Sequence, residues 1–213
     1  MSNSEKVYSK IKQLIFRGQI KPGERLIETE LCEKFATSRT PVREALNRLS
    51  SEKFIKITPN KGAQVARMTL KEIEEVQEFR MLIETKCLAE FSGNISSDDT
   101  DELVRLHNEM KINIKEMDIY KFVENNALFH LIFIEISGNT VISQTVKDLQ
   151  NRYYPHQYFT LTLPGVLDMS IQGHKEIVEC FINKEFKQAM RSIRKHYEDF
   201  KSVYKKLGEL NLI

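Results

Sequence analysis

Apolar residues recur every three or four positions along most of the chain, the spacing that places them on one face of an α-helix. In the first third this spacing predicts helices over residues 5–17 and 28–35 and over a third stretch, residues 38–49. Gly18 and Lys21-Pro22-Gly23 separate the first two helices with turn residues. Two short helices joined by a tight turn form a helix-turn-helix, and residues 28–49 fit that description.

The stretch SRTPVREALNRL, residues 38–49, has two distinct faces. One face is apolar and suited to burial: Val42, Ala45, Leu46 and Leu49. The other is a polar stripe of residues spaced by four: Arg39, Arg43 and Asn47. A helix docked by one side and presenting arginines on another can read a DNA major groove. An ordinary solvated amphipathic helix is the alternative.

A β-hairpin is predicted directly after this stretch, because residues 54–57 and 63–65 flank the turn sequence Thr58-Pro59-Asn60-Lys61-Gly62. A helix-turn-helix followed by a hairpin is the winged form of the motif. Lys61 and Gly62 at the hairpin tip suit a close approach to phosphate or to the minor groove.

From Thr69 onward, helical spacing predicts an all-helical bundle of about six helices. The expected spans are 69–91, 97–117, 120–137, 140 to about 158, the stretch after Pro164-Gly165 to about 183, and about 185–207. The predicted fold class is therefore mainly α, with one small β-hairpin. The predicted domains are a winged helix-turn-helix over residues 1–67 and a helical domain over residues 69–213.

Charge divides the chain at the same place. Residues 1–67 carry 14 Lys and Arg against 7 Asp and Glu, a net of +7, while residues 68–213 carry 18 against 23, a net of −5. A basic first third joined to an acidic remainder suggests a polyanion-binding module attached to a domain with another role.

The sequence predicts a cytoplasmic protein. No apolar run approaches the roughly 20 residues that cross a bilayer, and the N-terminal MSNSEKVYSK lacks the apolar core of a secretion signal. Cys32, Cys87 and Cys180 are odd in number and isolated, which favours a reducing compartment and cysteines that fill the core.

Several polar residues of the predicted bundle fall on apolar faces. His130 and Asn126 share a stripe with Phe133, and His174 and His196 lie in corresponding stripes of the last two helices. A buried polar group without a partner costs roughly 1–3 kcal/mol. Neutral imidazoles converging inside a bundle are natural ligands for Zn, Ni or Mn, so Asn126, His130, His174 and His196 are candidate metal ligands. A core histidine with an ordinary hydrogen-bond partner is the alternative for each, and His107 and His156 are expected to be non-ligands.

Arg80 follows the same logic, because it lies on the inner face of the first bundle helix with Ile83 and Cys87. An inward guanidinium requires an anion. Glu84, one turn further along the helix, could be that anion. The alternative is the carboxylate of a small effector. The candidate effector-binding residues are therefore Arg80, Glu84 and, further along the chain, Arg152.

The segment PGERLIETELCEKFATSRTPVREALNRLSSEKFI, closed by Lys61-Gly62-Ala63-Gln64-Val65, resembles the DNA-binding domain of GntR-family bacterial transcription regulators. The resemblance covers about the first 67 residues. It implies that Arg39 and Arg43 contact bases or backbone from the recognition helix and that Gly62 lies in the wing. The further candidate DNA contacts are Thr40, Asn47 and Lys61. Lys53 departs from the family, which usually has a glycine there; a left-handed lysine would be strained by about 1 kcal/mol.

The remainder resembles the FCD ligand-binding domain of the FadR branch of GntR regulators, through EFRMLIE, NALFHLIFIEISGN, His174-Lys175-Glu176-Ile177 and His196. Metal-binding members of that family add an aspartate four residues before the first histidine. Asn126 occupies that position here; it keeps an oxygen donor but loses the charge.

These patterns together predict a regulator that binds a palindromic operator as a homodimer and responds to a small organic acid. The acid would contact the metal and Arg80. One rival is a metal-dependent hydrolase or lyase, since three histidines with an open position can activate water. Another is a DNA-binding protein whose histidine cluster is purely structural.

Overall fold

The computed structural model describes residues 2–59 and 62–209. Its contacts divide the chain into two compact units, Met1–Met68 with Asp148–Phe159, and Thr69–Lys147 with Thr160–Ile213. The fold is mainly helical with one small sheet, as the sequence predicts. None of the described helices is long and apolar enough to cross a membrane.

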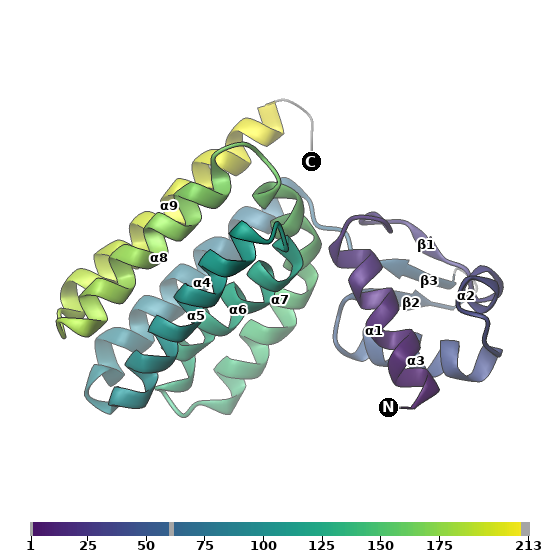
Figure 1. Ribbon diagram of the computed structural model, residues 1–213, viewed down its shortest axis with the longest axis horizontal. Helices are drawn as coiled ribbons and strands as arrows, with labels where there is room; N and C mark the ends of the chain where they lie inside the picture. The colour runs from purple at the N-terminus through teal and green to yellow at the C-terminus, as the bar shows by residue number, and fades with distance from the viewer. Residues whose placement is uncertain (1, 60–61, 210–213) are drawn as a thin grey trace. The chain divides into compact units, whose positions relative to one another are not determined.

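The first unit is a three-helix arrangement with a small antiparallel sheet (Figure 1). Helix α1 packs against α3, and α2 also contacts α3. The elements are α1 Asn3–Phe16, β1 Arg25–Leu26, α2 Glu28–Phe35, α3 Arg39–Ser51, β2 Ile55–Thr58 and β3 Gly62–Val65.

Strand β1 is an element that the sequence pattern did not predict. Its two residues, Arg25 and Leu26, pair with Gln64 and Ala63 of β3, so the sheet order is β1-β3-β2. Two residues are too few to show alternation, and only their pairing with the hairpin defines the strand. The hairpin itself lies where it was predicted, with Ile55 opposite Val65.

The second unit is a bundle of long helices (Figure 1). Helix α4 packs against α9, α8 against α9, and α5 against both α6 and α8. Its helices are α4 Leu70–Phe91, the short η1 Ser92–Asn94, α5 Ser97–Lys115, α6 Ile119–Glu135, α7 Thr140–Leu161, α8 Val166–Ile182 and α9 Phe186–Glu209. Residues Asp148–Phe159 of α7 group with the first unit.

Local sequence explains where two of these helices begin. The side chains of Thr69 and Ser96 each accept a hydrogen bond from the backbone amide of the third residue of the helix that follows. The carboxylate of that third residue accepts a bond from the backbone amide of the cap. These capping boxes satisfy amide groups that a helix start otherwise leaves without partners. They fix the first turns of α4 and α5.

Lys53 adopts the left-handed conformation that its position after the recognition helix implied. Its φ is +68°, and its amide donates to the carbonyl of Ser50 over 3.1 Å. A side chain in this region costs roughly 1–2 kcal/mol, whereas glycine tolerates it.

We expect Lys53→Gly to raise the free energy of unfolding of the first unit by about 0.5–1 kcal/mol, because the strain removed exceeds the entropy that glycine adds to the unfolded chain. Urea titrations followed by circular dichroism measure the change. Lys56→Gly is the control: Lys56 lies in β2 opposite Gln64, so that substitution should lower stability. Equal losses from both substitutions would contradict the strain assignment.

Candidate functional site

The recognition helix α3 buries one face and exposes the other. Val42, Ala45, Leu46 and Leu49 are buried, with Val42 and Leu49 fully inaccessible. Four residues predicted to contact DNA are exposed on the remaining surface: Arg39, Thr40, Arg43 and Asn47. Ser38 is the N-cap of the helix, without a side-chain capping bond. The geometry is that of a helix whose polar stripe is available to a partner.

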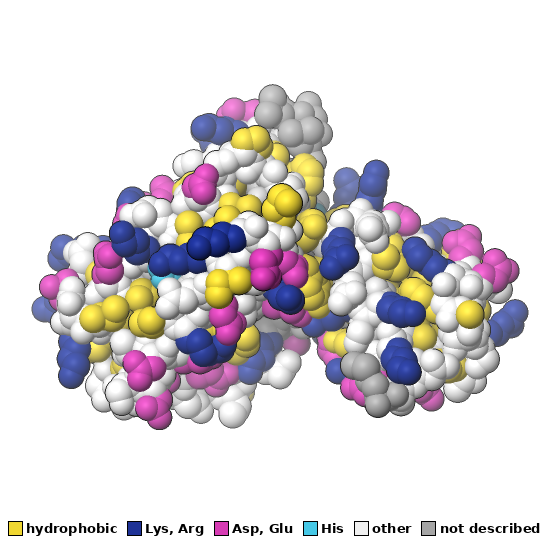
Figure 2. All heavy atoms as spheres, in the orientation of Figure 1, with side chains coloured by type: hydrophobic (Ala, Val, Ile, Leu, Met, Phe, Trp, Pro, Cys, Tyr) yellow, Lys and Arg dark blue, Asp and Glu magenta, His cyan; other side chains and the backbone are white. Residues whose placement is uncertain are grey.

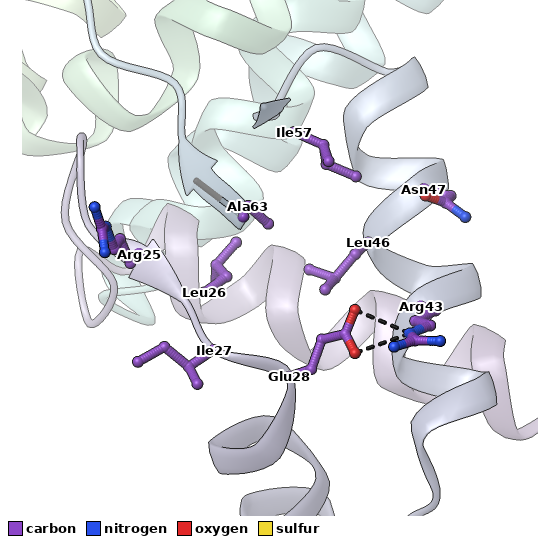
Figure 3. Close-up of a pocket in the computed structure, with 10 residues that line it drawn as sticks. Arg25, Leu26, Ile27, Glu28, Arg43, Leu46, Asn47, Ile57 and Ala63 are labelled. Carbon is purple, nitrogen blue, oxygen red and sulfur yellow. Dashed lines mark hydrogen bonds and ion pairs between the residues drawn. The ribbon is translucent and has the colours of Figure 1, made fainter. Parts of the chain in front are cut away.

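Arg43 is held by a carboxylate from the neighbouring helix (Figure 3). Its Nε–H donates to both oxygens of Glu28, the first residue of α2, over 3.0 and 2.8 Å. The side chains are 60% and 36% exposed, so the ion pair contributes only about 0–1 kcal/mol to stability. Its main effect is to orient the guanidinium, since both bonds are donated by Nε–H.

An open hollow of about 410 Å³ lies between α3 and the strands. Ile27 and Ile57 line it although they are 46% and 42% exposed. Figure 2 shows lysine and arginine side chains spread over the visible face of this unit. Gly62 of the predicted wing lines the hollow with a φ of +80°, whereas Lys61 lies outside the described residues. The full lining comprises Arg25, Leu26, Ile27, Glu28, Arg43, Leu46, Asn47, Ile57, Gly62 and Ala63.

In the second unit, three imidazoles from three helices converge: His130 of α6, His174 of α8 and His196 of α9. Among the described residues they form a group whose potential ligand atoms all lie within 4.8 Å of one another. Their exposed fractions are 3%, 0% and 5%. Aromatic rings surround them, with Phe129 4.7 Å from His174 and Phe200 5.2 Å from His196 between centroids. The cluster is therefore a buried set of nitrogen donors.

The spacing of two donors fits a tetrahedral metal ion. The Nε2 atoms of His130 and His174 lie 3.3 Å apart. Zinc–nitrogen distances of about 2.0–2.1 Å and a tetrahedral angle give a nitrogen–nitrogen separation of roughly 3.3–3.4 Å. His130, His174 and His196 would hold such an ion, which would act as a Lewis acid toward an oxygen-bearing ligand.

Burial favours the neutral form of two of these imidazoles, the form that coordinates a metal ion. Desolvation lowers the pKa of His174 and of His196 well below the ordinary imidazole value, and the neighbouring imidazoles lower both further. Both rings are accordingly neutral near pH 7, which is the form that binds metal.

Arg80 and Glu84 form the inward ion pair that the sequence offered as one alternative. Arg80 Nη2 donates to Glu84 Oε1 over 3.3 Å, and the side chains are 2% and 0% exposed. Glu84 also accepts from the hydroxyl of Tyr197 over 2.5 Å and contacts His130 Nδ1 at 2.8 Å. Burial opposes ionisation of Glu84, but His130, Arg80 and Tyr197 outweigh it, and the pKa of Glu84 is lowered. The carboxylate is therefore charged although it is fully buried.

Gly173 is a site residue that the sequence reading missed. A Cβ at this position of α8 would lie 2.5 Å from Nδ1 of His196. The absence of a side chain lets the imidazole of α9 approach α8 closely. A glycine beside a candidate histidine in a helix interior, where glycine costs stability, is the signal that could have found it.

The other predicted residues have distinct surroundings. Asn126 is buried on α6 one turn before His130, and its metal role stays a prediction. Arg152 is half-buried, in the part of α7 that groups with the first unit, and its effector role also stays a prediction. His107 and His156 are not in the histidine group. His156 Nε2 accepts from the amide of Met68, and burial lowers the pKa of His107.

Residues 75–199 match the family described as the FCD domain, and residues 3–65 match the bacterial regulatory proteins of the gntR family. The chain is a GntR-family regulator with an FCD domain. Its relatives include the gluconate operon transcriptional repressor of Bacillus licheniformis, which is 26% identical over 206 residues, covering 93% of this chain and 83% of the relative.

Solved structures share the fold of this GntR-family regulator. E. coli McbR/YncC superposes with a TM-score of 0.76 at 23% identity, covering 97% of this chain and 98% of that one. The metal-free FCD domain of TM0439 has a TM-score of 0.54 at 24% identity, covering 66% of this chain and 96% of that one. Because the curated relatives are named as transcriptional regulators and repressors, this protein is a DNA-binding regulator and not an enzyme. The hydrolase or lyase alternative is set aside.

We expect Arg43→Ala to weaken binding to a duplex that the wild-type protein selects from a random pool. The loss should be about 5- to 150-fold, because one bidentate arginine–guanine contact contributes roughly 1–3 kcal/mol. Fluorescence anisotropy with labelled duplex measures the affinity. Arg48→Ala is the matched control: it removes the same charge from the same helix, but Arg48 pairs with Glu52 and lies over Tyr8. If both variants lost the same DNA affinity, Arg43 would contribute only its positive charge and not a specific base contact.

Proposed function

We propose that this regulator is a cytoplasmic metal-dependent sensor whose affinity for operator DNA is set by a small carboxylate effector. The observation that supports the proposal is the convergence of His130, His174 and His196 in the buried centre of the FCD domain. Three imidazole ligands leave at least one coordination position of a Zn, Ni or Mn ion available to an oxygen ligand. FCD domains can bind metal, in keeping with this assignment.

A carboxylate suits this environment for two reasons. An oxygen of the effector would complete the coordination sphere, and the buried guanidinium of Arg80 lies in the same network. The relative from Bacillus licheniformis is a repressor of a gluconate operon, so gluconate is a reasonable first compound to test. Arg152 remains a proposed further contact.

The output would be a change in DNA binding by a homodimer. One recognition helix reads only a few base pairs, so two copies on a palindromic operator give specificity most economically. An effector that binds one arrangement of the dimer better than another shifts the population toward it. Coupling of about 1–3 kcal/mol would change operator affinity by 5- to 150-fold.

The test compares wild type with His130→Ala on a duplex selected by the wild-type protein. With Zn²⁺ bound, adding gluconate, citrate or other small hydroxy carboxylates in turn should change wild-type DNA affinity by at least fivefold for one compound. His130→Ala should retain the DNA affinity of the metal-free protein and lose the response, because it removes a ligand but leaves the recognition helix intact.

His107→Ala is the matched control, since His107 is a buried histidine of the same unit outside the group of three. It should keep the response. An unchanged response in His130→Ala, or a wild-type DNA affinity that neither Zn²⁺ nor any carboxylate alters, would contradict the sensor and leave the cluster with a structural role.

A further inference from the structure

Glu84 binds to three side chains at once in the interior of the bundle. Its Oε1 accepts from the Tyr197 hydroxyl over 2.5 Å and from Arg80 Nη2 over 3.3 Å. Its Oε2 lies 2.8 Å from Nδ1 of His130. The carboxylate is 0% exposed, so its position is fixed by these contacts. The contacts with Tyr197 and with His130 are both shorter than the ion pair with Arg80.

The contact with Glu84 determines which nitrogen of His130 faces the cluster. The guanidinium of Arg80 and the hydroxyl of Tyr197 both donate to Glu84, the pattern of a carboxylate. A carboxylate can only accept hydrogen bonds, so Nδ1 of His130 carries the proton and donates it to Oε2. In the neutral ring, Nε2 then keeps its lone pair. That lone pair belongs to the atom 3.3 Å from Nε2 of His174, on the side where the three imidazoles meet.

Besides orienting His130, Glu84 would stabilise a bound cation through its negative charge. The three histidines supply no negative charge, and neither would the amide of Asn126. A divalent ion in a buried site is stabilised by a nearby anion, and a carboxylate that accepts from a ligating histidine makes that histidine a stronger ligand. Glu84 is a buried carboxylate in direct contact with a member of the cluster.

We propose that Glu84 is a positioning residue of the metal centre, which orients His130 through Nδ1 and supplies the negative charge that the ligating side chains lack. Tyr197 and Arg80 hold the carboxylate in place for this task. The inference rests on the proposed metal site. It differs from assigning Glu84 only as the ion-pair partner of Arg80, because that assignment predicts no effect on metal affinity.

The test measures Zn²⁺ affinity of the full-length protein by competition with a chromophoric chelator. Glu84→Gln keeps the size of the side chain and removes its charge, and it should weaken Zn²⁺ binding by about 10- to 100-fold, the usual effect of losing such a partner of a ligating histidine. Glu135→Gln is the matched control, since Glu135 pairs with Lys147 and Ser143 outside the cluster. Its Zn²⁺ affinity should equal that of wild type.

A spectroscopic measurement separates positioning from general loss of structure. Nitrogen-15 shifts of the imidazoles in the metal-free protein should show His130 with its proton on Nδ1 in wild type and in Glu135→Gln. Glu84→Gln should lose that preference. If Glu84→Gln does not fold, Tyr197→Phe removes one bond that holds the carboxylate and should lower Zn²⁺ affinity several-fold.

The outcomes distinguish this inference from the proposed function. The role of Glu84 would be overturned if Glu84→Gln bound Zn²⁺ as tightly as wild type. If Glu84→Gln does not fold, the same result in Tyr197→Phe would overturn it. Either result would leave the proposed metal site itself intact. Failure of the wild-type protein to bind Zn²⁺ at one site per chain would overturn the metal site itself, and with it this inference.

Discussion

A charged carboxylate buried inside a helical bundle must be compensated, and this requirement organises the centre of the FCD domain. Glu84 has no access to solvent, and its stability as an anion depends on Arg80, Tyr197 and His130. Breaking a buried charged network by removing one member typically costs several kcal/mol. The network thereby ties α4, α6 and α9 to one another through side chains of fixed geometry.

The histidine cluster lies on the other side of His130 from this carboxylate. Its rings are packed among phenylalanines and are deprived of water, which keeps His174 and His196 neutral. Gly173 allows His196 to approach α8. The recognition face of the first unit contrasts with this arrangement: Arg43 is exposed and held by one carboxylate, so the guanidinium is oriented but available to a partner.

Periodicity predicted the helices because amphipathic faces are encoded locally, and the hairpin followed from its turn residues. Strand β1 was missed because Arg25 and Leu26 form a strand only through pairing with β3. The three histidines could be proposed from their apolar faces alone. The contact between Glu84 and Tyr197 joins residues 113 positions apart, and Gly173 matters only through a ring on another helix; such facts depend on packing that no local pattern contains.

The most direct test of this account is X-ray absorption spectroscopy of the full-length protein loaded with one Zn²⁺ per chain. We expect a first shell with three imidazole nitrogens at about 2.0–2.1 Å, completed by oxygen. The imidazole scattering should fall by one ring when His130 is replaced. A shell of oxygen ligands without imidazole, unchanged by that replacement, would show that zinc binds elsewhere and would contradict the assignment of the cluster as a metal centre.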